Sequence, residues 1–369
     1  MPQLQGLKIR GYRSIKSLDL DLRDTNVLIG PNAAGKSNFV RFFRLLRQIA
    51  DQNLQLHVRR SGDAESLLYY GSKVSPSLGG TLYFDSHGYL FELTPTEDGR
   101  LVFEQERILS RDDQETAGYI EKGHEETRLR DARNESWKVP KIIRSGIREF
   151  GIYHFQDTGP SAPSKTAVNI GDDHRLHSDA GNLAAVLYRL QERQPGAYGL
   201  IRRTVQRIFP EFGDFVLRPD THNDDKIRLQ WREKGEEYVF GAHQLSDGTL
   251  RFICLATLFL QPDPPSTIIV DEPELGLHPH ALGVLAGMVR SAATETQVIL
   301  STQSVTLLNQ FVPEDVVVVE REEDPEAPVE APRSHSTFRR VSDQEELDAW
   351  LDDYTLGDLW EMNVLGGQP

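Results

Sequence analysis

The sequence predicts an α/β protein with a mixed, mainly parallel core sheet, an antiparallel β insertion and a helical lobe. Three observations predict this fold. A glycine-bounded loop joins an apolar strand to an amphipathic helix over residues 26–50, apolar strands alternate with helices over residues 244–320, and strands joined by a short turn occur within residues 54–150. Alternating buried strands and helices are typical of a parallel sheet that helices cover on both faces.

The N-terminal segment combines two half-buried strands with a strand, a loop and a helix. LKIR (7–10) and LDLDL (18–22) alternate apolar and polar side chains, and NVLI (26–29) is an apolar run that ends at Gly30. From Ser37, apolar residues recur at helical spacing through SNFVRFFRLLRQIA.

Residues 54–150 have a different character. GGTLYFD reads as one strand, and YLFELTP and RLVFEQERIL read as two more that are joined around an Asp98-Gly99 turn. The charged, weakly apolar stretch from Ser110 to Asn134 is expected to be mobile or helical and exposed. We interpret the segment as an inserted antiparallel sheet with a polar excursion.

Strands and helices then alternate along the rest of the chain. GIYHF (151–155) predicts a strand, QDTGPSAPSK a loop, NLAAVLYRLQER and YGLIRRTVQRIF two amphipathic helices, and FVLRP, KIRLQW and EYVFGA strands. After Gln244 the predicted order is helix (TLRFICLATLFLQ), strand (TIIV), helix (HALGVLAGMVRSAA), strand (QVILS), helix (VTLLNQF) and strand (VVVVE). A Pro- and Glu-rich connector (322–335) and a short helical region with Trp350 and Trp360, which we expect to pack on the core, follow.

Composition limits the class of protein. With 369 residues, 38% hydrophobic and 26% charged, the chain can bury a large core, and it has no apolar run of the roughly 20 residues that span a membrane. No secretory signal is apparent, and the single cysteine, Cys254, excludes a disulfide framework and a cysteine-based metal cluster. We therefore expect a soluble, cytoplasmic protein without a membrane partner.

Charge is unevenly distributed. The net charge of −15 argues against a nucleic-acid ligand, but residues 320–369 hold 14 acidic and 4 basic residues and so carry −10 of it. A basic face on the remainder is compatible with this balance.

Residues 30–37 (GPNAAGKS) match the phosphate-binding loop G-x-x-x-x-G-K-[ST], the P-loop, in every defined position, after an apolar strand and before a helix. The loop N–H groups and the helix N-terminus favour phosphate oxygens. Lys36 is expected to reach the β and γ phosphates of ATP, and the Ser37 hydroxyl to bind Mg²⁺. The predicted nucleotide-binding residues of this segment are Gly30, Pro31, Asn32, Ala33, Ala34, Gly35, Lys36, Ser37 and Asn38.

A second apolar strand ends in two acids, Asp271 and Glu272. In a parallel sheet its carboxyl end lies beside the P-loop, where Asp271 can hold Mg²⁺ through water and Glu272 can accept a proton from the attacking water. A solvated acidic turn is the alternative. QLSDGT (244–249) opens a helix some 20 residues earlier, with Ser246 as its N-cap.

GPNAAGKSN, LSDGTLRF, TIIVDEPELGLHP and QVILSTQS, in this order, resemble the ABC-type P-loop ATPases of the SMC, RecF and OLD-like group, and IRGYRSIKSLDLDL resembles their first hairpin. The closing WLDDYTLGDLWEMNVLGGQP resembles a bacterial branch labelled "AAA family". The resemblance implies an ATP-dependent homodimer in which Ser246 and Gly248 of one subunit contact the γ-phosphate held by the other. Gly276-Leu277-His278-Pro279 would then communicate across the interface.

Two residues depart from the group's pattern. Asp247 replaces a glycine of the signature and places a carboxylate near phosphate. Gln303 stands where many relatives carry a switch histidine, and it can hydrogen-bond phosphate or water but carries no charge. The resemblance therefore implies slow hydrolysis, with Glu272, Lys36 and Gln303 as the catalytic set.

Further candidates keep two interpretations each. Arg13 matches an arginine that reaches phosphate in related heads, or is a surface arginine; Gln156 senses Mg²⁺, or is a polar loop residue. Glu274 positions Glu272, or caps a helix. Arg41, Arg44 and Arg47, followed by Arg59-Arg60, form either a phosphate-binding stripe or a solvated helix face.

The resemblance divides the chain into five segments: 1–53, the N-terminal part of the ATPase head with the P-loop; 54–150, the inserted subdomain; 151–243, a lobe of helices and strands; 244–320, the signature helix, acidic strand and switch; and 321–369, an acidic linker and C-terminal helix. No long heptad arms, C-x-x-C hook or nuclease domain is evident. The expected function is ATP hydrolysis coupled to action on double-stranded DNA, in repair or anti-phage defence. The alternative is a nucleotide-gated switch that regulates a separately encoded effector such as a nuclease.

Overall fold

The computed structural model describes residues 3–85, 87–110, 116–120, 122–129, 138–328, 333–343 and 347–368. The chain forms two compact units, the first made of Met1–Ile152, Pro265–Ile269 and Val312–Pro369, and the second of Tyr153–Pro264 and Val270–Phe311. Within the described ranges, none of the helices has both the length and the apolar character needed to cross a bilayer.

The first unit contains a six-stranded antiparallel sheet. Its strands, in spatial order, are β2 (Ile15–Asp21), β1 (Leu4–Tyr12), β4 (Leu78–Phe84), β5 (His87–Pro95), β6 (Leu101–Ser110) and β7 (Thr116–Ile120). The predicted first hairpin is confirmed, with Leu7 opposite Leu20. The predicted turn between β5 and β6 is confirmed as well, with Pro95 opposite Leu101.

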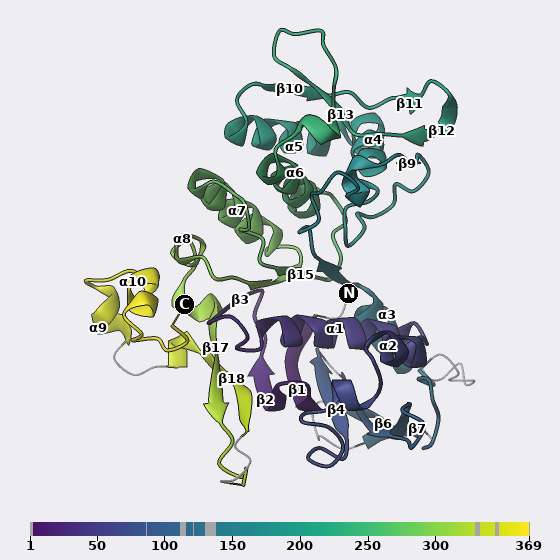
Figure 1. The fold of residues 1–369 in the computed structure, drawn as a ribbon, viewed down its shortest axis with the longest axis vertical. Helices are drawn as coiled ribbons and strands as arrows, with labels where there is room; N and C mark the ends of the chain where they lie inside the picture. Colours follow the sequence, from purple (N-terminus) through teal and green to yellow (C-terminus); the bar gives the residue numbers. More distant parts are fainter. Residues whose placement is uncertain are drawn as a thin grey trace. The chain divides into compact units, whose positions relative to one another are not determined.

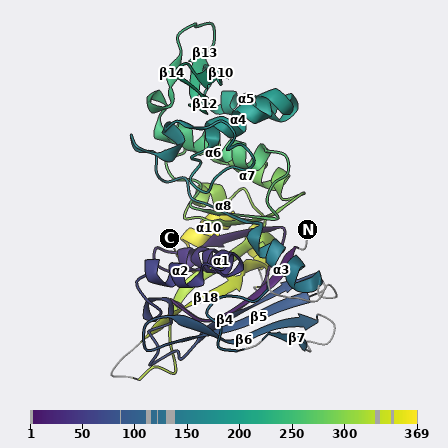
Figure 2. The same cartoon turned by 90° about the vertical axis from the view of Figure 1, so that its right-hand side faces the viewer.

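Helices α1 (Lys36–Ala50), α2 (Leu54–Arg60) and α3 (Lys138–Arg148) lie over this sheet (Figures 1 and 2). The phenylalanines of α1 recur at helical spacing and bury one face. The centre of the Phe42 ring lies 5.2 Å from the centre of the Tyr12 ring of β1 and 6.2 Å from that of the Phe91 ring of β5. A Cβ on Gly80 would lie 2.8 Å from Phe42 Cζ, so the sheet admits this ring only because position 80 has no side chain.

The expectation of an exposed, mobile or helical stretch from Ser110 to Asn134 is wrong for its described part. Residues 116–120 form strand β7, and residues 122–129 carry three buried side chains, those of His124, Thr127 and Leu129. Residues 111–115, 121 and 130–134 lie outside the described residues.

The cause is a fully buried carboxylate, that of Glu106 on β6. It accepts hydrogen bonds from the Tyr89 hydroxyl (2.7 Å), from the Thr127 hydroxyl and from the Arg128 N–H (3.2 Å), and it lies 2.8 Å from His124 Nε2. A buried carboxylate without such partners would be strongly destabilising, so His124 and Thr127 are drawn into the core.

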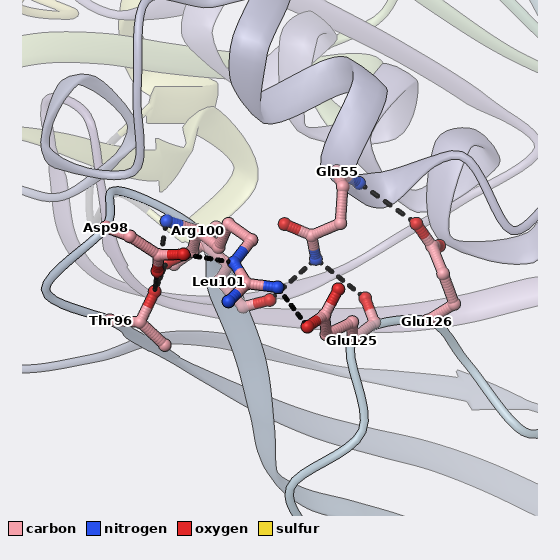
Figure 3. A network of polar contacts seen from close by, with 7 residues as sticks. All are labelled: Gln55, Thr96, Asp98, Arg100, Leu101, Glu125 and Glu126. Carbon is pink, nitrogen blue, oxygen red and sulfur yellow. Dashed lines mark hydrogen bonds and ion pairs between the residues drawn. The ribbon is translucent and has the colours of Figure 1, made fainter.

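A second network ties the same segment to α2 (Figure 3). Glu126 accepts hydrogen bonds from the Leu54 and Gln55 N–H groups at the start of α2, at 2.9 and 3.0 Å. The Gln55 amide donates to the carbonyls of Leu101 and Glu125, each at 2.7 Å. These bonds satisfy helix N–H groups that would otherwise lack partners.

A three-stranded group in the first unit supports the P-loop. Strand β17 (Val316–Glu323) pairs in parallel with β3 (Thr25–Ile29) and antiparallel with β18 (Ser334–Arg340). The predicted connector at 322–335 therefore begins and ends in paired strand, with Glu323 opposite Ser334, while residues 329–332 lie outside the described residues. The sequence pattern does not predict β18. The mixed α/β fold class is confirmed.

The C-terminal residues form α9 (Leu347–Leu351) and α10 (Leu356–Glu361). Trp360 is fully buried and its indole N–H donates to the Gly367 carbonyl, whereas Trp350 stays 43% exposed beside Tyr354. The expectation of packing is therefore confirmed for Trp360, whereas Trp350 is only partly covered.

The second unit is mainly helical, and α4, α5 and α6 lie together in it (Figure 1). Its helices are α4 (Leu183–Arg193), α5 (Pro195–Ile208), α6 (Asp247–Leu260), α7 (Pro279–Ala292) and α8 (Val305–Leu308). Two small sheets have the orders β10 (Phe212–Phe215), β13 (Gln230–Glu233), β14 (Phe240–Gly241) and β11 (Pro219–Asp220), β12 (Asn223–Ile227), β9 (Val168–Asn169). Strand β16 (Gln297–Ser301) belongs to this unit, and the unit boundary crosses β8 (Phe150–Tyr153) and β15 (Thr267–Asp271).

The predicted helices of this unit are confirmed, but the run KIRLQW is divided between β12 and β13. The five-segment division of the chain stays a prediction.

Candidate functional site

The P-loop between β3 and α1 has the backbone that its glycines predict. Gly30 and Gly35 have φ of +146° and +124°, and Ala33 has φ of +64°. A Cβ on Gly30 would collide with the Val319 carbonyl, and one on Gly35 with the Ser336 hydroxyl. Both positions therefore require glycine, and alternating conformations of this kind turn successive N–H groups toward an anion.

Lys36 is the first residue of α1 and its side chain closes back over the loop. It is 5% exposed, and its ammonium donates to the carbonyls of Gly30 and Pro31, the latter at 3.0 Å. The loop thus holds a buried cation at the N-terminus of a helix, which is the donor set that a polyphosphate requires. Asn32 and Ala33 are exposed, and Ser37 and Asn38 are half-buried.

Two serines outside the motif hold the loop from behind. The Ser336 hydroxyl lies 2.5 Å from the Ala34 carbonyl and 2.7 Å from the Ser14 hydroxyl, and the Asn38 amide donates to Ser14 at 2.8 Å. Ser336 comes from β18, some 300 residues away in the sequence. No local pattern marks it, whereas Ser14 could have been suspected from its place beside Arg13.

Arg13 occupies the turn between β1 and β2. It has φ of +49°, its N–H donates to the Leu67 carbonyl at 2.9 Å, and its guanidinium carbon lies 5.8 Å from the Tyr12 ring centre. Its buried Nε has no hydrogen-bond partner. The adjacent Ser14, and not the Arg13 side chain, bonds to the support of the P-loop, so the phosphate role of Arg13 stays a prediction.

The predicted acids lie where β15 ends, in the second unit. The Ser301 hydroxyl donates to Asp271 Oδ1, and the Glu272 N–H donates to the Ser301 carbonyl at 2.9 Å. Asp271 and Glu272 thus continue the pairing between β15 and β16, with half-buried side chains.

Two amides hold the Glu272 carboxylate. Gln303 Nε2 donates to Oε1 at 2.6 Å, and Gln156 Nε2 donates to Oε2 at 3.4 Å. Glu272 also has φ of +49° although Pro273 follows it, a conformation that costs on the order of 1–3 kcal/mol. The Glu272 carboxylate is thus held by two side chains from distant segments, and its role stays a prediction.

Glu274 acts on this arrangement indirectly. Its Oε1 accepts hydrogen bonds from the Thr302 hydroxyl at 2.7 Å and from the Gln303 N–H at 2.8 Å. Burial raises the pKa of Glu274, and these two bonds oppose that shift. Glu274 therefore fixes the backbone of the glutamine that touches Glu272, and both of its donors lie in the segment that follows β16.

The signature segment starts α6 as predicted. Ser246 caps the helix by accepting a hydrogen bond from the Thr249 N–H at 3.1 Å, and its side chain is exposed. A Cβ on Gly248 would collide with the Gly276 carbonyl, so the first helical turn packs closely on the loop after Glu272. His278 in that loop caps α7 by accepting from the His280 N–H at 3.2 Å.

The departure at Asp247 has a local compensation. The Lys165 ammonium lies 3.7 Å from the Asp247 carboxylate, and the lysine side chain is 8% exposed. Lys165 lies in the Pro- and Ser-rich loop QDTGPSAPSK, and neither that loop nor the signature pattern identifies it as a partner for Asp247.

Within the second unit, the structure brings Gln156, Glu272 and Gln303 into direct contact. Within the first, it closes the Lys36 side chain over the P-loop carbonyls. The joint Mg²⁺ site of Ser37, Asp271 and Gln156, which takes residues from both units, stays a prediction, as do the catalytic and binding roles of all these residues.

A phosphate-binding loop closed by a buried lysine, on a mixed α/β sheet with an antiparallel insertion, defines a nucleotide-binding fold of the P-loop class. The chain belongs to the family described as "AAA domain, putative AbiEii toxin, Type IV TA system", whose model matches residues 25–309. No curated protein matches the chain.

Solved structures with a similar fold are SMC heads. A head bound to the C-winged helix domain of ScpA has a TM-score of 0.55 and 15% identity, over 91% of this chain and 98% of that one. A head with an extended coiled coil, bound to the C-terminal domain of ScpA derived from Pyrococcus furiosus, has a TM-score of 0.55 and 13% identity, over 96% and 99%. One with a coiled coil and joint derived from Pyrococcus yayanosii has a TM-score of 0.51 and 12% identity, over 93% and 98%.

Proposed function

We propose that this chain is a Mg²⁺-dependent ATPase that closes as a homodimer around ATP and couples hydrolysis to action on double-stranded DNA, in repair or anti-phage defence. The observation that carries the hydrolytic part is the Glu272 carboxylate, held by the Gln303 and Gln156 amides and on a strained backbone. A surface acid would need neither support.

Each residue contributes a defined step. Lys36 and the loop N–H groups bind the phosphates, and Glu272 accepts the proton of the attacking water. Gln303 orients the Glu272 carboxylate through its amide. A bound Mg²⁺ would neutralise phosphate charge, held by Ser37, Asp271 and Gln156.

The dimeric part of the proposal rests on α6. Its N-terminus presents an exposed Ser246, which caps the helix by accepting from the Thr249 N–H, and Lys165 offsets the carboxylate of Asp247 there. Such an end suits the γ-phosphate of a nucleotide bound by a second copy.

The DNA part rests on the arginines of α1 and α2. Arg41, Arg44, Arg59 and Arg60 are exposed, as a phosphate-binding stripe requires. Arg47, on α1 as well, is half-buried and therefore less accessible than the other arginines.

A partner-gated switch is the second candidate, and the C-terminal surface favours it. Trp350 and Tyr354 are 43% and 41% exposed, and residues 341–369 contain no lysine or arginine. An acidic surface with exposed aromatic rings repels DNA and suits a protein. The family description, which names a toxin–antitoxin system, also supports cooperation with a separately encoded protein.

Steady-state ATP hydrolysis by the wild type and Glu272→Gln, each with and without linear double-stranded DNA at low salt, tests the proposal. We expect Glu272→Gln to lower kcat by about 10²–10⁴-fold, the usual contribution of a general base, and to leave nucleotide binding intact. Glu295→Gln, which changes an exposed acid of the same unit, serves as the control.

The outcomes separate the candidates. Stimulation of the wild type by DNA supports the DNA-acting ATPase, whereas slow turnover that DNA does not change supports the switch. Equal turnover of wild type and Glu272→Gln would remove Glu272 from the mechanism.

A further inference from the structure

Arg251 is a buried arginine on α6 to which the sequence motifs assign no role. It is 8% exposed, and all three guanidinium nitrogens donate hydrogen bonds to main-chain carbonyls. Nε donates to Phe155 at 2.9 Å, Nη2 to Gln156 at 3.3 Å, and Nη1 to Leu275. Burying a cation is costly unless it is hydrogen-bonded, and each of the three guanidinium nitrogens donates to one of these carbonyls.

The three carbonyls belong to two segments that meet at Glu272. Gln156 donates its own amide to Glu272 Oε2, so Arg251 fixes the main chain of a residue whose side chain touches that carboxylate. Leu275 is three residues beyond Glu272, in the loop that follows it. One guanidinium therefore holds both the Gln156 segment and the backbone that carries Glu272.

The same loop also packs tightly against the start of α6. A Cβ on Gly248 would collide with the Gly276 carbonyl, and a Cβ on Gly276, which has φ of +71°, would lie 2.8 Å from Arg251 Nη1. The first turn of α6, the loop after Glu272 and the Arg251 side chain are thus in contact with no room between them. A shift of that turn must move the carbonyls that Arg251 binds.

The electrostatics agree with a tethered cation. Burial lowers the pKa of Arg251, and the charge of the nearby Asp247 opposes this shift. An arginine remains protonated under any such shift at neutral pH. The cation is therefore permanent, and its planar fork suits three separate carbonyls better than an ammonium does.

We propose that Arg251 is a positioning residue that couples the Ser246–Gly248 turn of α6 to the Glu272 carboxylate, through the backbones of Gln156 and Leu275. This inference rests on the proposed function, because it matters only if Glu272 activates water. A phosphate that engages the turn would be sensed at Glu272 through hydrogen bonds that the protein already makes.

Arg251→Lys tests this in the full chain, since lysine keeps the charge but loses the fork. Hydrogen bonds from a charged donor are among the stronger ones in proteins, so we expect kcat for ATP to fall about 10- to 100-fold. The affinity for a fluorescent ATP analogue should stay within about twofold, because the P-loop residues are unchanged. Arg290→Lys is the matched control: Arg290 of α7 also donates to a main-chain carbonyl, that of Gln310.

A double-mutant cycle with Gln156→Ala separates positioning from general support. Because Arg251 acts through both Gln156 and Leu275, the loss of kcat in the double variant should be smaller than the product of the two single losses. Losses that multiply fully would show that Arg251 does not act through Gln156 and would overturn the inference. Gly276→Ala is the alternative variant if Arg251→Lys folds poorly, because its Cβ displaces the Arg251 guanidinium without removing it. Combined with Gln156→Ala, it should show the same non-additive loss of kcat.

The two proposals fail differently. If Glu272→Gln abolishes turnover while Arg251→Lys matches the wild type, the inference about Arg251 falls and the proposed function stands. If the wild type does not hydrolyse ATP, both fall.

Discussion

The P-loop and the Glu272 cluster are two candidate sites that the same chain builds in different ways. Eight consecutive residues, 30–37, supply nearly all of the P-loop, and glycine conformations set its shape. The Glu272 cluster takes its groups from Gln156, α6, the end of β15 and the segment after β16. A contiguous loop depends on backbone geometry, whereas the dispersed cluster depends on side chains that hold one another.

The largest effect that tests this contrast is expected at Lys36. Lys36→Ala removes the buried cation of the loop, and hydrogen bonds to a charged group contribute about 1.5–3 kcal/mol, so ATP affinity should fall about 10- to 100-fold. Equilibrium titration with a fluorescent ATP analogue measures it. Lys73→Ala, an exposed lysine of the same unit, should leave the affinity unchanged.

The contrast predicts opposite behaviour for the two sites. Lys36→Ala should lose binding, whereas Glu272→Gln should keep binding and lose turnover. An Lys36→Ala variant that binds ATP as tightly as the wild type would contradict the assignment of the P-loop.

A smaller effect is expected at Ser336, where the P-loop stops being self-contained. Ser336→Ala removes the hydroxyl that bonds to Ala34 and Ser14, and an ordinary hydrogen bond contributes about 1 kcal/mol net. We therefore expect a loss of about 1 kcal/mol in the free energy of unfolding, measured with urea, and a loss in ATP affinity of about fivefold. Ser334→Ala, on the same strand but bonded to Arg321, should affect affinity less.

Ser336 also marks the limit of what the sequence predicts. The P-loop, the acids after β15 and the N-cap at Ser246 follow from local patterns, because glycine conformation, strand termination and helix capping involve neighbours in the chain. Ser336, Lys165 and Arg251 act on residues distant in sequence, and no local pattern identifies them. The same dependence on distant residues limits what the sequence predicts about the fold.

Burial of one carboxylate explains why composition is misleading for residues 122–129. Their composition is polar, but Glu106 recruits His124 and Thr127 into the core. The 322–335 segment is misleading for a similar reason, since its Pro- and Glu-rich sequence hides a hairpin whose second strand carries Ser336.

The smallest effect concerns pH at the tip of that hairpin. Asp324, 3% exposed at its side chain, lies 2.7 Å from the Lys16 ammonium of β2 and accepts a hydrogen bond from the Tyr69 hydroxyl at 3.1 Å. The Lys16 hydrogen bond holds the pKa of Asp324 below its usual value. A carboxyl whose pKa is lower in the folded state stabilises the fold above its unfolded pKa of about 3.9, and this contribution disappears as pH falls through the lowered pKa.

Urea unfolding of the wild type and Lys16→Met at pH 7 and across the acidic range measures this contribution. The wild type should be the more stable at pH 7. The difference in the free energy of unfolding should shrink as the pH falls, because protonated Asp324 no longer carries the charge that attracts Lys16. Lys8→Met, which breaks the more exposed pair with Asp19, is the control and should give a smaller difference at pH 7. A difference between wild type and Lys16→Met that stays constant down to the lowest pH would mean that packing of the lysine stem, and not the ion pair, connects the hairpin that supports the P-loop to β2.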